Sequence, residues 1–210
     1  MEKLKAFFAS ALEYTKQAKF ELIMLFGFLI LDLLSKGLVN ATMELGESKT
    51  LIPKLLHITY VHNDAAAFGS SFGLEKLFGK NGTMIFFIIL SFVAVCFFSY
   101  FLYRSRTEKK LCRSAYALII AGATGNLIDR ILYGYVRDFV QFEYLGLEIF
   151  GSTTFAIFNI ADACLCVGVV LFAVYYIFMY KEPKKEIVKS EPTNNTDNES
   201  PQIGDNNNGI

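Results

Sequence analysis

Residues 83–103 have the sequence TMIFFIILSFVAVCFFSYFLY, a run of 21 residues without a charged side chain. The hydrocarbon core of a bilayer is about 30 Å thick, and a helix needs roughly 20 residues to cross it. Three further apolar windows of this length lie at about 22–40, 114–133 and 154–180. Because backbone polar groups in lipid must be satisfied internally, all four windows are predicted to be helices. The sequence therefore predicts an all-α integral membrane protein built on a bundle of four transmembrane helices.

The composition of the 210-residue chain agrees with this class. Hydrophobic residues make up 53% of the chain and charged residues only 19%, below the usual quarter of a soluble protein. The formal net charge is zero and no basic patch dominates, so no nucleic-acid partner is expected. Four cysteines with only two histidines make neither a disulfide framework nor a zinc site. We expect no metal and no cofactor.

Charge in the short connections predicts the orientation. The connection after the second window carries five basic residues against Glu108: Arg104, Arg106, Lys109, Lys110 and Arg113. Both flanks of the bundle are also rich in lysine. Since basic residues are retained on the cytoplasmic side, this connection and both termini are predicted to be cytoplasmic. The connections at 41–82 and 134–153 are then expected to face outward.

Two segments flank the predicted membrane domain at 21–180. Residues 1–20 place Leu4, Phe7, Phe8, Ala11 and Leu12 at helical spacing, which predicts an amphipathic helix at the cytoplasmic interface. Residues 181–210 are rich in Asn, Ser, Asp and Glu and are predicted to form a disordered cytoplasmic tail. In the outward connection, alternation over 55–61 predicts a short strand.

Polar side chains inside transmembrane helices mark candidate sites because they are costly there. They lie at same-face spacing on three of the predicted helices: Asp32, Ser35 and Lys36; Asn126, Asp129 and Arg130; and Asn159 with Asp162. At about 1.5 Å per residue, counting from the outward helix ends places Asp32, Asn126 and Asp162 at roughly 10–12 Å depth. These faces are expected to meet near the outward side, with Asp138 just beyond the third helix.

A purely structural role is the simpler interpretation for some of these residues. Asp32 and Lys36 can form a self-neutralised i,i+4 pair, and Asp129 beside Arg130 can serve helix packing. Gly122 and Gly125 are typical of helices in close contact, and Gly122 can also leave room for a substrate.

Asp162 and Asp138 differ from the other acids. Asp162 has no basic residue in its own helix, and Asp138 has only its neighbour Arg137, which a turn can direct elsewhere. Two adjacent carboxylates without cationic partners share one proton, so that one acts as acid while the other activates water. This is the requirement of an aspartic hydrolase.

Other chemistries are poorly supported. The sequence has no Gly-x-Ser-x-Gly, His-Glu-x-x-His or phosphate-loop motif. Ser35 and Lys36 are helix neighbours whose side chains diverge by about 100°, which disfavours a Ser/Lys hydrolase. A small ion-coupled transporter stays an alternative, although transporters place sites near the midplane and show inverted repeats. A membrane scaffold without enzymatic activity would leave Asp162 without a purpose.

Four sequence blocks resemble the bacterial lipoprotein signal peptidase family, the type II signal peptidases. They are DLLSK at 32–36, NDAAAFG at 63–69, AGATGNLIDR at 121–130 with VRDF at 136–139, and FNIAD at 158–162. The blocks occur in the family's order over about residues 20–180.

The resemblance implies an intramembrane aspartyl endopeptidase of the bacterial cell membrane. Its substrates would be diacylglyceryl-modified prolipoproteins, cut just before the lipidated cysteine, and Asp138 and Asp162 would form the catalytic dyad. Matching positions that shape the site or contact substrate are Asp32, Lys36, Asn63, Gly122, Asn126, Asp129, Arg130 and Asn159. The family fold adds an extracytoplasmic β-cradle and a short amphipathic helix, which residues 72–79 can form. We expect a monomer surrounded by membrane lipids.

The chain departs from the family pattern at three places. Asp64 and Ala65 replace the usual Thr-Gly of the loop motif, which removes a residue with easy access to positive φ. Arg137 stands where an apolar residue is usual, and the segment between Asp138 and Asp162 is a few residues longer than typical.

Overall fold

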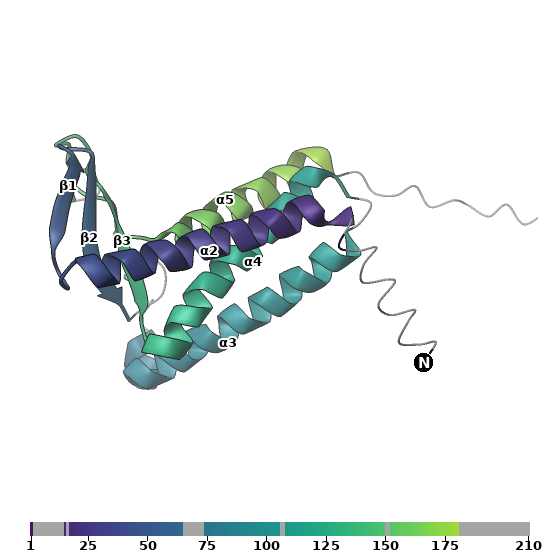
Figure 1. Cartoon of the computed structure of the whole chain (residues 1–210), viewed down its shortest axis with the longest axis horizontal. Coiled ribbons are helices and arrows are strands. Elements are labelled where there is room, and N and C mark those ends of the chain that lie inside the picture. Colours follow the sequence, from purple (N-terminus) through teal and green to yellow (C-terminus); the bar gives the residue numbers. More distant parts are fainter. Residues whose placement is uncertain (2–14, 16, 65–73, 106–107, 150–151, 181–210) are drawn as a thin grey trace, which may run out of the picture. The chain divides into compact units, whose positions relative to one another are not determined.

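The computed structural model describes residues 1, 15, 17–64, 74–105, 108–149 and 152–180. Its helices are α2 (Lys19–Thr42), α3 (Leu74–Arg104), α4 (Lys110–Tyr133) and α5 (Ile160–Val174), the last continued by one π-helical segment, η2 (Tyr175–Met179). Four helices, with α5 and η2 taken as one, are long and apolar enough to cross a membrane. The predicted class, a four-helix membrane bundle, is confirmed (Figure 1).

Helix α4 is the centre of the bundle and packs against the other three helices. Its most apolar stretch is 78% buried within the protein, against 11–22% for the other helices. Small residues permit this contact: a Cβ atom at Gly122 would collide with the Ala161 carbonyl oxygen, and one at Gly125 would lie 2.5 Å from the Asp32 carboxylate. The predicted role of both glycines in close helix approach agrees with this packing.

A small antiparallel sheet lies at one end of the bundle, called the sheet end below (Figure 1). Its strands are β1 (Ser48–Ile52), β2 (Leu56–Asn63) and β3 (Val136–Phe142), in the order β1-β2-β3. The strand predicted at 55–61 corresponds to β2. The register sets Val61 opposite Asp138, so that the end of β2 lies beside the candidate acid.

The predicted start of the fourth helix, at residue 154, is wrong. Helix α5 begins at Ile160, because Asn159 and Asp162 form a reciprocal capping box at its first turn. The preceding backbone instead pairs with the third strand: the Phe155 N–H donates to the Phe142 carbonyl at 2.8 Å, and the Phe158 N–H donates to the Val140 carbonyl at 3.0 Å. Asp162 therefore lies in the first helical turn, not eight residues below the start of the helix.

The second long helix also starts earlier than its apolar window. Helix α3 begins at Leu74 and is interrupted at Gly79, whose φ of 68° divides a short first segment from the long apolar one. The short helix expected at 72–79 is present from residue 74 onward, and residues 72–73 lie outside the described residues. So do residues 2–14, 65–69 and 181–210, on which the expected N-terminal helix, most of the 63–69 block and the C-terminal tail fall.

Candidate active site

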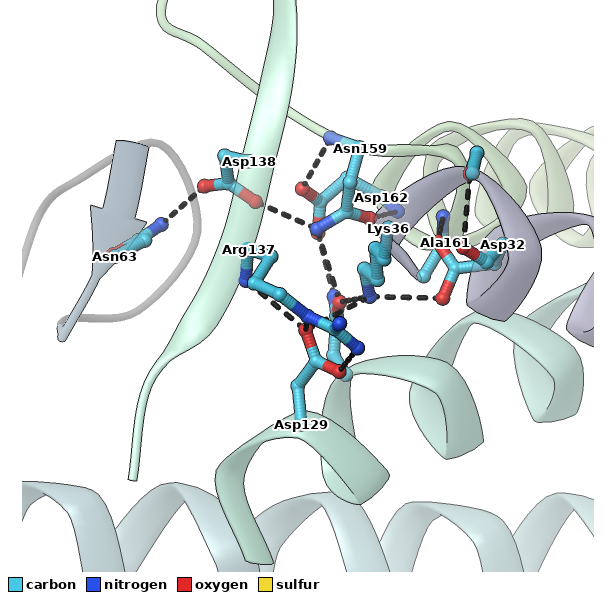
Figure 2. A network of polar contacts seen from close by, with 11 residues as sticks. Asp32, Lys36, Asn63, Asp129, Arg137, Asp138, Asn159, Ala161 and Asp162 are labelled. Atoms are coloured by element: carbon cyan, nitrogen blue, oxygen red, sulfur yellow. Dashed lines mark hydrogen bonds and ion pairs between the residues drawn. The ribbon is translucent and has the colours of Figure 1, made fainter. Parts of the chain in front are cut away.

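Asp138 lies on β3 at the sheet end and is almost completely buried, with 1% of its surface exposed. Its Oδ2 accepts a hydrogen bond of 2.8 Å from the Asn63 side-chain amide, and its Oδ1 accepts one of 2.6 Å from the Asn159 amide. Asn63 is the last residue of β2, and Asn159 caps α5. Figure 2 shows Asp138 held between these two amides.

Asp162 is fixed by the start of α5 and by the neighbouring α4. Its Oδ1 accepts 2.7 Å from the Asn126 amide of α4, and its Oδ2 accepts 3.2 Å from the Asn159 backbone N–H. In return the Asn159 Oδ1 accepts 3.0 Å from the Asp162 N–H, which completes the capping box. The spacing Asn-x-x-Asp is a visible sequence signal for this arrangement.

Two asparagines join the carboxylates into one network. The Asn159 amide that binds Asp138 also donates 3.1 Å to the Asn126 Oδ1, while the Asn126 amide donates to Asp162. The ammonium of Lys36 donates 2.9 Å to the same Asn126 oxygen. The structure thus brings the polar faces of α2, α4 and α5 together with the strand that carries Asp138 (Figure 2).

Asp32 forms an ion pair with a lysine. Asp138 and Asp162 instead accept hydrogen bonds from side-chain amides and a backbone N–H. The Lys36 Nζ lies 2.8 Å from the Asp32 Oδ2, and both side chains are at most 1% exposed. The other Asp32 oxygen accepts 2.8 Å from the Ala161 N–H at the start of α5. The geometry is that of the self-neutralised pair considered above, and it also anchors α2 to α5.

Asp129 is bound by Arg137, at an ion-pair distance of 2.6 Å, and lies 3.7 Å from Lys36. In the sequence, Arg137 is notable as the basic neighbour of Asp138 and as a departure from the family pattern. Nothing there indicates its partner Asp129, eight residues earlier, because that contact depends on the fold. Arg130, its carbon Cζ 5.5 Å from the centre of the Phe87 ring, borders the cavity described below.

Burial and the negative charge of Asp162 raise the pKa of Asp138 to about 7, although the two amide hydrogen bonds and Lys36 oppose the shift. Near neutral pH the pair of acids therefore retains a proton that a solvent-exposed aspartate would lose. A buried carboxyl and a partly buried one that share one proton supply a general acid and a general base at one place. Among the described residues, no cluster of three or more His, Cys, Asp or Glu side chains forms a metal site.

A cavity of about 280 Å³ opens beside this centre. Asn63, Asn126, Arg130 and Asp162 give it a polar border, and apolar side chains from α3, α4 and α5, among them Phe87, Leu90 and Leu165, form its wall. Gly122, at the α4–α5 contact, is not among the residues that line it. The cavity thus joins a polar centre to a surface suited to aliphatic chains.

A family profile described as Signal peptidase (SPase) II matches residues 24–178. The chain is 34% identical over 164 residues to the lipoprotein signal peptidase of Lactobacillus johnsonii, a match that covers 78% of this chain and 95% of the relative. It is 36% identical over 156 residues to that of Staphylococcus carnosus (74% and 89% covered). It is 38% identical over 145 residues to that of Listeria monocytogenes serotype 4a (69% and 84% covered).

Two solved structures are similar to this chain in both fold and sequence. A bacterial membrane enzyme determined by the in meso method at 2.3 Å resolution is 32% identical, covers 79% of this chain and 94% of its own, and superposes with a TM-score of 0.65. A second, at 1.9 Å resolution, is 31% identical with a TM-score of 0.60 and covers 77% and 95%. These similarities give no support to the transporter interpretation.

Proposed function

The chain belongs to the signal peptidase II family, and we propose that Asp138 and Asp162 are its catalytic pair. As a member of this family it is a multi-pass membrane protease that removes signal peptides from prolipoproteins. Our proposal adds that the substrates carry a diacylglyceryl group on a cysteine and that the peptide bond just before this cysteine is cut.

The observation that carries the proposal is the difference in partners among four acids of the polar centre, three of them buried and Asp162 partly buried. Asp32 and Asp129 are paired with Lys36 and Arg137. Asp138 and Asp162 accept hydrogen bonds from asparagine amides and a backbone N–H. An amide positions a carboxylate without neutralising it, so this pair keeps the freedom to exchange a proton that catalysis requires.

In the proposed reaction the two carboxyls share one proton, and Asp138 is taken as the acid that carries it at the start. The ionised Asp162 accepts a proton from a water molecule as the water oxygen attacks the scissile carbonyl carbon. Asp138 donates its proton to the carbonyl oxygen, which gives a neutral tetrahedral diol. Asp162 then gives the proton that it took from water to the leaving amide nitrogen, and Asp138 takes a proton from a diol hydroxyl as the C–N bond breaks. The carboxylic acid and the amine are released, and both aspartates return to their starting states. Asn63, Asn126 and Asn159 hold the carboxylates in place throughout.

The apolar wall of the cavity supports the choice of a lipidated substrate. Its side chains come from three membrane-crossing helices, so that acyl chains can reach it from the bilayer. Each buried methylene group stabilises binding by about 0.8 kcal/mol. The diacylglyceryl group would therefore provide much of the affinity, with Arg130 and Asn63 at the polar border placed to bind peptide or ester oxygens.

A cleavage assay in detergent tests this function directly. One prolipoprotein is prepared with and without the diacylglyceryl group and incubated with the purified full chain. Cleavage before the modified cysteine, with little or none of the unmodified precursor, supports the proposal. Equal rates on the two precursors would contradict lipid recognition, and no cleavage of either would contradict the substrate class.

We further propose a monomer in the cell membrane with both termini cytoplasmic, a membrane domain over 21–180 and flanking segments at 1–20 and 181–210. The basic connection between α3 and α4 supports this orientation, because Lys and Arg are retained inside. A cysteine introduced at Ser190 should react with an impermeant thiol reagent only after the cells are opened. Labelling of this cysteine in intact cells would contradict the proposed orientation and place the C-terminal segment outside.

A further inference from the structure

Arg137 lies on β3 directly before Asp138, opposite His62 of β2. Successive side chains of a strand point to opposite faces, so the guanidinium and the Asp138 carboxylate diverge. Figure 2 shows this: Asp138 points toward Asn63 and Asn159, and Arg137 points toward Asp129 of α4. Arg137 therefore does not neutralise the neighbouring acid.

Three hydrogen bonds join Arg137 to Asp129. The guanidinium donates through Nε to Oδ2 at 3.1 Å and through Nη2 to Oδ1 at 2.6 Å, and the Arg137 backbone N–H donates to Oδ2 at 3.0 Å. The side chains are 7% and 0% exposed. The guanidinium carbon also lies 4.5 Å from the centre of the Tyr133 ring. A buried two-pronged contact of this kind fixes orientation as well as distance.

This contact connects β3, the strand of Asp138, to helix α4, whose Asn126 side chain donates a hydrogen bond to Asp162. Asn126, which donates to Asp162, precedes Asp129 by three residues on α4 and therefore shares its face. One turn of α4 thus carries both connections: Asn126 to Asp162, and Asp129 to the residue before Asp138. The hydrogen bonds of the Asp138 carboxylate itself go to β2 and to the cap of α5.

Arg137 also affects which groups the Lys36 ammonium contacts, because both cations lie near Asp129. With Asp129 occupied by Arg137, the Lys36 ammonium lies 2.8 Å from Asp32 and 2.9 Å from the Asn126 oxygen, and 3.7 Å from Asp129. Without Arg137, the buried Asp129 carboxylate would attract Lys36 more strongly. Lys36 would then move away from Asn126, whose amide group holds Asp162.

We propose that Arg137 is a positioning residue for the catalytic pair: its fork on Asp129 fixes β3 against α4 and keeps Lys36 on Asn126. This inference rests on the proposed function, because it takes Asp138 and Asp162 as the pair. It assigns a role to a residue at which this chain departs from the family pattern.

The test compares two arginine–carboxylate pairs at opposite ends of the bundle, each with a buried carboxylate. Arg137→Met removes the fork at the sheet end. Arg113→Met is the matched control, because Arg113 pairs with the buried Glu21 at 3.0 Å near the starts of α4 and α2. Steady-state cleavage of one lipidated prolipoprotein is measured over pH for both variants and for Arg137→Lys, together with thermal unfolding in detergent.

We expect Arg137→Met to lower kcat by about tenfold to a hundredfold through misplacement of the acids, with KM changed by about threefold or less. Loss of a nearby cation disfavours ionised carboxylates, so the acidic limb of the pH profile should move to higher pH. Charged and titratable groups around Arg137 are Asp129, Tyr133, Lys36, Tyr60, His62 and Tyr135. Arg137→Lys should keep the limb in place and lose only part of kcat. Arg113→Met should lower the Tm without moving the pH profile.

A double variant, Asp129→Asn with Arg137→Met, separates positioning from stability if Arg137→Met folds poorly. It removes both buried charges, so its Tm should recover while kcat stays low. Recovery of both Tm and kcat, or an Arg137→Met enzyme with wild-type kcat and pH profile, would overturn the inference. Activity in Asp138→Asn or Asp162→Asn would instead overturn the proposed function, so the two failures are distinct.

Discussion

The two ends of the helix bundle differ in how completely their acids are paired. At the end away from the sheet, Glu21 pairs with Arg113, Tyr175 donates to Glu108, and the Tyr116 and Tyr176 hydroxyls lie 3.0 Å apart. Aromatic and aliphatic side chains surround them, including the cluster of Leu102, Cys112, Tyr116, Ile120 and Tyr175. The two acids described at this end, Glu21 and Glu108, thus have a cation and a hydroxyl as partners, as a stable core requires.

The sheet end contains two acids that lack this compensation. Asp138 and Asp162 accept from amides, and they lie beside a cavity with a polar border. Burying a carboxylate with amide donors alone lowers folding stability, because only a cationic partner fully compensates the loss of its hydration. The comparison indicates that one end of the bundle is built for stability and the other for proton transfer.

The largest expected effect is an opposite response of the two ends to loss of an acid. Asp138→Asn and Asp162→Asn should each lower cleavage by about a thousandfold or more, because each acid has its own part in one proton cycle. Both variants should remain folded and membrane-inserted. Glu21→Gln removes the ion pair of the partly buried Arg113 and should lower stability by up to about 3 kcal/mol, while folded enzyme keeps its turnover.

Cleavage assays and thermal unfolding of the same detergent-solubilised samples measure both quantities. Near-normal turnover in either aspartate variant would remove the distinction between the two ends. So would a Glu21→Gln enzyme that loses turnover in its folded fraction.

The sheet end should also make the stability of the protein depend on pH, through the titration of Asp138. The pKa of Asp138 is about 7 in the folded protein and 3.8 in the unfolded reference. The folded protein therefore binds this proton more tightly than the unfolded chain does. The contribution of this proton to folding stability is fully present below pH 3.8 and is lost as pH rises through about 7. The loss amounts to at most about 4 kcal/mol, shared with Asp162.

Unfolding in detergent at pH 5 and pH 8 measures this contribution. Wild-type protein should lose more stability across the interval than Asp138→Asn, which has no titrating group at this position. Equal losses in the two proteins would show that Asp138 is already ionised at pH 5.

The helical bundle could be predicted because lipid imposes length and apolarity on each crossing segment. The window at 83–103 lies inside α3 and the one at 114–133 inside α4. The start of α5 was misplaced because Thr154 and Phe155 are as compatible with a membrane helix as with a strand. Only pairing with β3 and the Asn159 cap decide between the two.

The site was predictable to the extent that its residues share helix faces. Asp32 with Lys36, and Asn159 with Asp162, follow from spacing along one helix. The links between elements, from Asn63 to Asp138 and from Arg137 to Asp129, depend on the register of β2 and β3 against α4. The sequence carries no local signal for them.

A smaller effect is expected from the amide that strand β2 contributes. Asn63→Ala removes the 2.8 Å hydrogen bond to Asp138 and leaves Asn159 as its amide partner. Asp138 becomes ionised as it donates its proton, and a lost hydrogen bond to a charged group corresponds to about 1.5–3 kcal/mol. The value of kcat/KM should therefore fall by about tenfold to a hundredfold. Steady-state kinetics measure the change, and an unaffected enzyme would exclude Asn63 from the site.

The smallest effect is expected one residue further, at Asp64, where the molecule passes from the buried centre to its surface. Asp64 directly follows Asn63, which binds Asp138. It nevertheless forms an ion pair of 2.5 Å with Lys80, and the two side chains are 44% and 65% exposed. Exposed ion pairs contribute about 0–1 kcal/mol because water competes with them. Asp64→Thr, which restores a residue like that of the family motif, should therefore change kcat/KM by about threefold or less and leave the pH profile in place. The matched control is Lys80→Met, which breaks the same pair from the other side and should give the same small change. If Asp64→Thr abolished cleavage while Asn63→Ala did not, the proton-sharing acid would be Asp64, and the assignment of Asp138 and Asp162 as the catalytic pair would be wrong.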